Sequence, residues 1–182
     1  MTRVHIDHVA MCVKDLDTAV ADWKDILGVL MPGHTEQITY GEGTSDGTPM
    51  VWATFQNPDP TGVSIQLWAP GADNTWVHKV LAKRGEFVHH IAFLSSNFGH
   101  TIEQCRAADL PLLLEGDSSP DTMPWLQWNF IPEAKAHGVL IELATRYQAA
   151  GDRWVPHPGN TEQTELLEEM KKRFYLPSGG PK

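Results

Sequence analysis

Two histidines occupy matching places in a repeated segment. Ile-Asp-His-Val-Ala-Met at 6–11 is matched by Val-His-His-Ile-Ala-Phe at 88–93, with apolar, His, β-branched and Ala positions in the same order. The repeat makes His90 the equivalent of His8. Because side chains alternate along a strand, His89 is expected on the opposite face. Histidine is the commonest metal ligand and a proton carrier near neutral pH, so this pair indicates one of those two roles.

A second repeated segment supplies oxygen donors. Gly-Val-Ser-Ile-Gln-Leu at 62–67 is matched by Gly-Val-Leu-Ile-Glu-Leu at 138–143, which makes Gln66 and Glu142 equivalent. Each half therefore begins with a histidine and ends with Gln or Glu. If the halves pack about a pseudo-twofold axis, the four side chains converge as two symmetric pairs. Nitrogen and oxygen donors together suit a borderline divalent cation.

Each of these four residues alone also has a simpler interpretation. A single strand histidine is more often packed or solvent-exposed than bound to a metal, and a carboxylate flanked by Ile and Leu is typical of a half-exposed strand. The shared repeat positions favour the metal site, because independent surface residues have no reason to occupy equivalent places.

Strands and helices must position these residues. The repeated segments are short, apolar and bounded by turn residues, which predicts strands that open and close each half. Further strands are expected at 49–56 and 125–131, and the segments 36–40 and 112–114 are candidates for the remaining ones. Helical spacing predicts helices at 15–28, 75–84 and 99–109. Asp17 or Thr18 is the expected cap of the first helix, and Gly28 and Gly85 are the expected ends of the first two.

This order predicts an α+β fold of two paired βαβββ modules, at about 4–70 and 86–146, that form a curved mixed sheet around the metal site. The expected domain is 1–146. A C-terminal extension at 147–182 is expected to hold one amphipathic helix at 161–174, which either covers a core edge or subunit contact or acts as a lid.

Composition excludes several classes of function. The net charge of −9 and the pI near 5.4 argue against nucleic acid as a partner. No apolar run approaches the roughly 20 residues that a membrane span requires, so no membrane partner and a cytoplasmic location are expected. Cys12 and Cys105 lie in apolar segments without metal-binding spacing and are expected to be free.

The motifs together resemble the vicinal oxygen chelate superfamily, which includes glyoxalases, bleomycin resistance proteins and extradiol dioxygenases. The resemblance extends over about residues 4–147 and is closest to members like methylmalonyl-CoA epimerase. The matching motifs are I-D-H-V-A at 6–10, L-G at 27–28, I-Q-L-W-A-P at 65–70, H-H-I-A at 89–92 and G-V-L-I-E-L at 138–143.

The resemblance implies one octahedral divalent metal ion, Co, Mn, Ni, Zn or Fe. Its protein ligands would be His8, Gln66, His90 and Glu142, with two positions open for substrate oxygens. A metal that chelates these oxygens stabilises an enolate. The resemblance therefore implies an isomerase, epimerase or lyase that acts on a small carbonyl or acyl-CoA substrate.

The proton-transfer group departs from the family pattern. An epimerase needs a base on one face of the substrate and an acid on the other. Related epimerases supply one of them from a glutamate before the Gln66 strand, where this sequence has Trp52. Glu36, Glu42 or Asp46 in the preceding loop is a candidate substitute, and Glu142 is a further candidate acid or base.

Aromatic residues indicate the character of the substrate pocket. Trp52, Trp68, Trp125 and Trp128 lie on or beside expected strands, which suggests a cavity for a flat or apolar substrate. Core packing is the alternative explanation for each tryptophan. Basic residues at 79, 83 and 84 would suit coenzyme A phosphates, or form a solvated helix face.

Two other functions are compatible with these modules. Two His and one Glu, with Gln66 outside the ligand set, resemble the facial triad of iron(II) dioxygenases. Relatives of the resistance type bind an apolar ligand without chemistry, but these commonly lack the metal ligands. Paired modules can lie in one chain or be exchanged between two, so a homodimer is compatible with the sequence.

Overall fold

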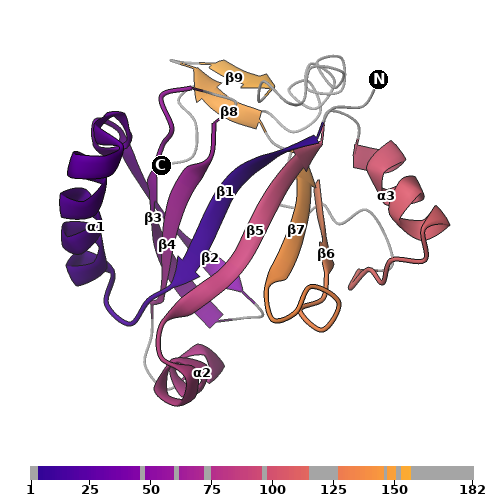
Figure 1. Ribbon diagram of the computed structural model, residues 1–182, viewed down its shortest axis with the longest axis horizontal. Helices are drawn as coiled ribbons and strands as arrows, with labels where there is room; N and C mark the ends of the chain where they lie inside the picture. Colours follow the sequence, from indigo (N-terminus) through magenta and orange to yellow (C-terminus); the bar gives the residue numbers. More distant parts are fainter. Residues whose placement is uncertain are drawn as a thin grey trace. The chain divides into compact units, whose positions relative to one another are not determined.

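The computed structural model describes residues 4–45, 48–59, 62–71, 75–95, 98–114, 127–145, 147–150 and 153–156. Within these ranges it has the predicted α+β fold (Figure 1). Seven strands form one mixed sheet in the order β2-β3-β4-β1-β5-β7-β6, and β8 and β9 form a separate two-stranded sheet. The helical elements are α1 (Leu16–Leu30), the 3-10 helix η1 (Pro32–Thr35), α2 (Trp76–Arg84) and α3 (Phe98–Ala107). The strands of the large sheet are β1 (Val4–Cys12), β2 (Ile38–Ser45), β3 (Thr48–Phe55), β4 (Ser64–Pro70), β5 (Phe87–Ser95), β6 (Gln127–Ile131) and β7 (Leu140–Thr145).

The chain divides into two compact units. One consists of residues 8–91, and the other of residues 1–7 and 92–182. The division cuts β1 and β5, the two strands that carry the repeated His segments.

In the unit of residues 8–91, apolar side chains cover one face of the strands. β1 and β4 are parallel, and β3 lies antiparallel between β2 and β4. Helix α1 lies beside β3 and β4 in Figure 1 and packs on this face. The buried residues of this cluster are Val13, Val20, Leu27, Ala53, Phe55, Leu67 and Ala69.

The ends of α1 differ from the predicted ones. Asp15 caps the helix, because its carboxylate accepts a 2.8 Å hydrogen bond from the Thr18 backbone N–H, so the prediction of Asp17 or Thr18 as the cap is wrong. The helix also continues through Gly28 to Leu30. A single helical glycine costs only about 1 kcal/mol relative to alanine, whereas Pro32 follows directly and cannot extend the hydrogen-bond ladder.

A second apolar cluster forms where α2 packs. Thr75 caps α2, and Gly85, with φ of 75°, ends it, both at the predicted limits. The buried members of this cluster are Cys12, Met50, Trp68, Val77 and Leu81, with Trp52 and Phe87 packed against them.

The other unit repeats the strand and helix pattern with one exception. Helix α3, close to the predicted 99–109, packs against β7 through Phe98, Ile102, Cys105 and Leu143. The segment 112–114 is not a strand. A backbone hydrogen bond of 2.9 Å joins Leu113 N–H to the carbonyl of Phe130, and the Asn129 side chain bonds both backbone groups of Leu114. A polar side chain thus replaces part of a strand ladder.

The described part of the C-terminal extension contains a feature that the sequence did not predict. Strands β8 (Tyr147–Ala150) and β9 (Arg153–Pro156) pair as an antiparallel hairpin. The expected helix at 161–174 lies outside the described residues, as do Asp46 and Trp125. Among the described helices, none has the length and apolar character of a membrane span.

Candidate metal site

His8 and His90 form a buried pair. Their side chains are only 2% and 8% exposed, and their Nε2 atoms lie 3.0 Å apart. Two nitrogens that bind one cation at right angles, each at about 2.1 Å, are separated by roughly 3 Å. The observed separation therefore suits adjacent positions around an octahedral ion.

Gln66 lies on the same face of the sheet as His8. In the parallel pairing of β1 with β4, Ala10 is opposite Gln66 and His8 is opposite Ser64, and paired residues share a face. The Gln66 Nε2 donates to Thr54 Oγ1 at 3.3 Å. This bond directs the amide nitrogen to the neighbouring strand and leaves the Oε1 atom as the one that suits a cation.

Glu142 lies on β7, where it is half-buried and paired with Phe130. His8, His90 and Glu142 are a group of described residues that could hold a metal ion, each with one ligand atom. Two imidazoles and a carboxylate are a donor set that suits a first-row divalent metal. The residues present thus fit the cation that the sequence predicted.

His89 contacts its neighbour His90, although strand alternation predicts their side chains on opposite faces. Its Nδ1 lies 2.8 Å from the Nδ1 of His90. Its ring centroid is also 4.5 Å from that of Trp68. Alternation fixes the directions of the Cβ atoms, whereas a ring nitrogen lies two bonds further out and can turn toward its neighbour. The adjacent histidines in the sequence were the available signal for this contact.

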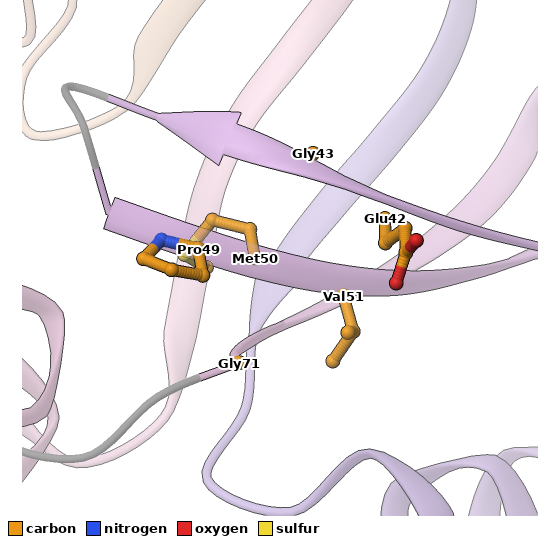
Figure 2. A pocket seen from close by; sticks show the side chains of 6 residues that line it. All are labelled: Glu42, Gly43, Pro49, Met50, Val51 and Gly71. Carbon is orange, nitrogen blue, oxygen red and sulfur yellow. The ribbon is translucent and has the colours of Figure 1, made fainter.

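Two of the candidate proton-transfer carboxylates, Glu42 and Glu36, lie in the described part of the chain. Glu42 is exposed on β2 and pairs with Val51, so it lies on the face opposite to Trp52 and Gln66, because neighbouring positions alternate. It lines a small pocket with Val51, Gly43, Pro49, Met50 and Gly71, and Figure 2 shows Glu42 and Val51 on adjacent strands. This position does not favour Glu42 as the acid or base, which stays a prediction. Glu36 is exposed directly after η1.

Trp52 and Trp68 form a cross-strand pair on the Gln66 face. The Trp52 ring lies over two glycines of β2. A Cβ added at Gly41 would come within 2.6 Å of this ring, and one at Gly43 within 3.0 Å. The glycines thus leave room for a flat aromatic wall. Trp128, on β6, is half-buried opposite Ala144.

Cys12 is also on this face but does not suit a metal ligand. It pairs with Trp68 and is completely buried. Burial, with a smaller effect from the Glu86 charge, raises the pKa of its thiol to about 12. Because a metal binds the thiolate, the neutral Cys12 is a packing residue.

A family model agrees with this fold and residue pattern. The model described as Glyoxalase/Bleomycin resistance protein/Dioxygenase superfamily matches residues 7–122, more than half of the chain. The chain belongs to this superfamily. The resemblance to vicinal oxygen chelate proteins inferred from the motifs is therefore confirmed.

Solved structures of superfamily enzymes have the same fold. Methylmalonyl-CoA epimerase from Mycobacterium tuberculosis is 28% identical, with a TM-score of 0.58, and the match covers 77% of this chain and 86% of that chain. A variant of the Streptomyces coelicolor methylmalonyl-CoA epimerase in complex with 2-nitronate-propionyl-CoA is 25% identical, with a TM-score of 0.57, and the match covers 78% and 96%. A comparison with curated proteins gave no match.

Proposed function

We propose that this superfamily member is a metal-dependent enzyme that moves a proton through a metal-stabilised enolate. The observation that carries the proposal is the buried pair of His8 and His90, with Nε2 atoms 3.0 Å apart. Burying two imidazoles with their ring nitrogens in contact is favourable when these nitrogens share a proton or a cation. A bound cation would act as a Lewis acid toward adjacent substrate oxygens.

Glu142 and Gln66 would complete the ligand set. Glu142 brings a negative charge that partly neutralises a divalent ion, and Gln66 brings a neutral amide oxygen. The bond from Gln66 to Thr54 supports this role, because it fixes the rotation of the amide. Glu142 is also the carboxylate that we retain as a candidate acid or base.

Trp52 argues against a reaction that needs a proton-transfer group at its position. An epimerase needs proton-transfer groups on both faces of its substrate, and Trp52 has no ionisable group at the position where related epimerases have a glutamate. We therefore favour an isomerase or lyase that needs one proton-transfer group over a methylmalonyl-CoA epimerase. The ring of Trp52, held over Gly41 and Gly43, suits an apolar or flat part of the substrate.

The substrate class follows from the same features. The Streptomyces coelicolor relative was solved with an acyl-CoA analogue, and the exposed Lys79, Lys83 and Arg84 on α2 offer charge for phosphates. A small carbonyl compound with two adjacent oxygens is the other class, and it needs no basic residues. Comparing turnover of these two classes separates them.

An iron(II) dioxygenase is the second candidate. Two His and one Glu match the facial triad. In this alternative, Gln66 stays outside the ligand set and keeps its bond to Thr54. Iron in the purified protein, together with oxygen uptake during turnover, would select the dioxygenase.

Metal analysis tests the proposed function. Wild-type protein purified without added metal should contain about one divalent ion per chain, and His8→Ala or His90→Ala should remove it. His137→Asn is the matched control, because this exposed histidine has φ of 56°, which asparagine tolerates. Wild-type protein that binds no divalent metal would contradict the proposal, as would full metal content in both alanine variants.

A further inference from the structure

We propose that His89 is a positioning residue that sets the tautomer of His90 and so presents the His90 Nε2 to the metal. This inference rests on the proposed metal site and adds a residue to it. It concerns contacts within residues 8–91 only.

The hydrogen bond between the rings of His89 and His90 limits which nitrogens can carry a proton. The Nδ1 atoms of His89 and His90 lie 2.8 Å apart, a hydrogen-bond distance in which one of them must donate. A neutral imidazole carries one N–H. The Nε2 of His90 can bind a cation only without a proton, so its proton must be on Nδ1. His90 then donates to the Nδ1 of His89, and His89 keeps its own proton on Nε2.

The opposite proton arrangement would prevent metal binding by His90. If the Nδ1 of His89 donated instead, the neutral His90 would carry its proton on Nε2, the atom that faces His8 at 3.0 Å. Each arrangement satisfies the short contact, but only one leaves the metal-facing nitrogen with a free electron pair. Metal-binding histidines generally donate their other ring N–H to a neighbouring acceptor, which raises their basicity. His89 is placed to be that acceptor.

Aromatic contacts hold the His89 ring in the position to accept. Its centroid lies 4.5 Å from that of Trp68, with the planes tilted by 36°, and 6.1 Å from that of Phe87. Trp68 is itself 8% exposed within an apolar cluster. The rotation of His89 is therefore restricted by packing, which is what an orienting residue requires.

Two substitutions of His89 test its role as a hydrogen-bond acceptor separately from its role as a packed aromatic ring. His89→Phe keeps an aromatic ring against Trp68 but has no nitrogen. His89→Asn loses the ring, yet its side-chain oxygen lies close to the place of the imidazole Nδ1 and accepts a hydrogen bond. A positioning role predicts damage in the first variant and rescue in the second, whereas a packing role predicts the reverse order.

The test combines metal titration with nitrogen NMR. In zinc titrations, His89→Phe should raise the Kd by about 10- to 100-fold, and His89→Asn should recover most of the affinity. In long-range proton–nitrogen spectra of metal-free protein, His90 should carry its proton on Nδ1 in the wild type and His89→Asn, and should populate both tautomers in His89→Phe. Thermal unfolding checks that both variants are folded.

The outcomes are distinguishable from failure of the metal site itself. Wild-type protein that binds no divalent metal, zinc included, overturns the proposed function. Zinc binding that His89→Phe leaves unchanged, with the His90 tautomer also unchanged, overturns the role of His89 alone. If His89→Phe does not fold, the tautomer in the wild type decides: a His90 proton on Nε2 in metal-free protein overturns the inference, and a proton on Nδ1 supports it.

Discussion

The two repeated halves join their strands in different ways. In the first half, β2 and β3 form a regular ladder. It runs from the pair of Ile38 and Phe55 to the pair of Ser45 and Thr48. In the second half, the segment 112–114 is joined to β6 by the bond from Leu113 to Phe130 and by the buried Asn129 side chain.

This difference assigns separate tasks to the halves. A regular ladder with Gly41 and Gly43 gives the Trp52 ring a flat support, whereas a side-chain clamp fixes an irregular segment without extending the sheet. The last strands of the two halves also differ, because β4 carries the amide Gln66 where β7 carries the carboxylate Glu142. The duplicated fold thus keeps equivalent ligand positions, although the strands around them are joined differently in the two halves.

The largest expected effect concerns this ligand difference. Glu142→Gln removes the charge and makes both halves end in an amide. Metal affinity should fall by more than about 100-fold, because changes to residues that only contact a metal ligand already cost about 10- to 100-fold. Gln66→Ala removes a neutral ligand and should cost about tenfold. Isothermal titration with Mn²⁺ measures both, and equal losses would show that the halves contribute alike.

Asn129 provides the next test, since it is fully buried and its side chain bonds Leu114 and the Phe130 N–H. Asn129→Ala leaves these backbone groups without that partner and should lower the free energy of unfolding by about 2–4 kcal/mol. Gln56→Ala breaks the exposed bond to Thr39 in the first half and should cost about 0.5 kcal/mol. Urea denaturation compares the two, and similar costs would contradict the clamp.

The support of Trp52 is tested at Gly41. A Cβ at this position would lie 2.6 Å from the indole, so Gly41→Ala should displace the ring and cost about 1–3 kcal/mol. Gly28→Ala is the matched control, because nothing lies within 4 Å of its added Cβ and alanine favours the helix by about 0.5–1 kcal/mol. Tryptophan fluorescence and thermal unfolding report both effects. An unchanged spectrum in Gly41→Ala would contradict the close contact.

The smallest effect is the pH dependence of the α1 cap. Hydrogen bonds from the side chain and the backbone N–H of Thr18 lower the pKa of Asp15 below its usual 3.8. A lowered folded-state pKa stabilises the protein above pH 3.8, and this contribution is lost as the pH falls through the folded-state value. Thermal unfolding should therefore show the wild type losing its advantage over Asp15→Ala at the acid end of a pH 3–7 series. A constant difference over that range would contradict the linkage.

Much of this architecture could be predicted because it depends on local patterns. Repeated apolar segments predicted β1, β4, β5 and β7, and Gly85 predicted the end of α2. The repeat also predicted the His8 and His90 pair, because symmetry relates positions that are distant in sequence. The domain limits at 1–146 and 147–182 and the homodimer stay predictions.

Other features depend on rotamers and register that no local pattern specifies. The turn of His89 toward His90 is a side-chain rotation, and the face of Glu42 follows from the β2–β3 register. The Asn129 clamp joins a loop to a strand across the sequence. Such contacts are settled by tertiary packing, which can override local preference.

The thiol of Cys12 follows His8 on the same strand and face, and its exposed fraction is zero. With a pKa near 12 it is neutral as well as inaccessible, and alkylating reagents attack thiolates. Modification therefore requires β1 to separate transiently from its neighbours. The rate of Cys12 labelling then reports how often the strand that holds His8 opens. A metal ion bound to His8 would make this opening rarer and so slow the labelling of Cys12. Metal occupancy can therefore be followed at an atom that takes no part in binding the metal.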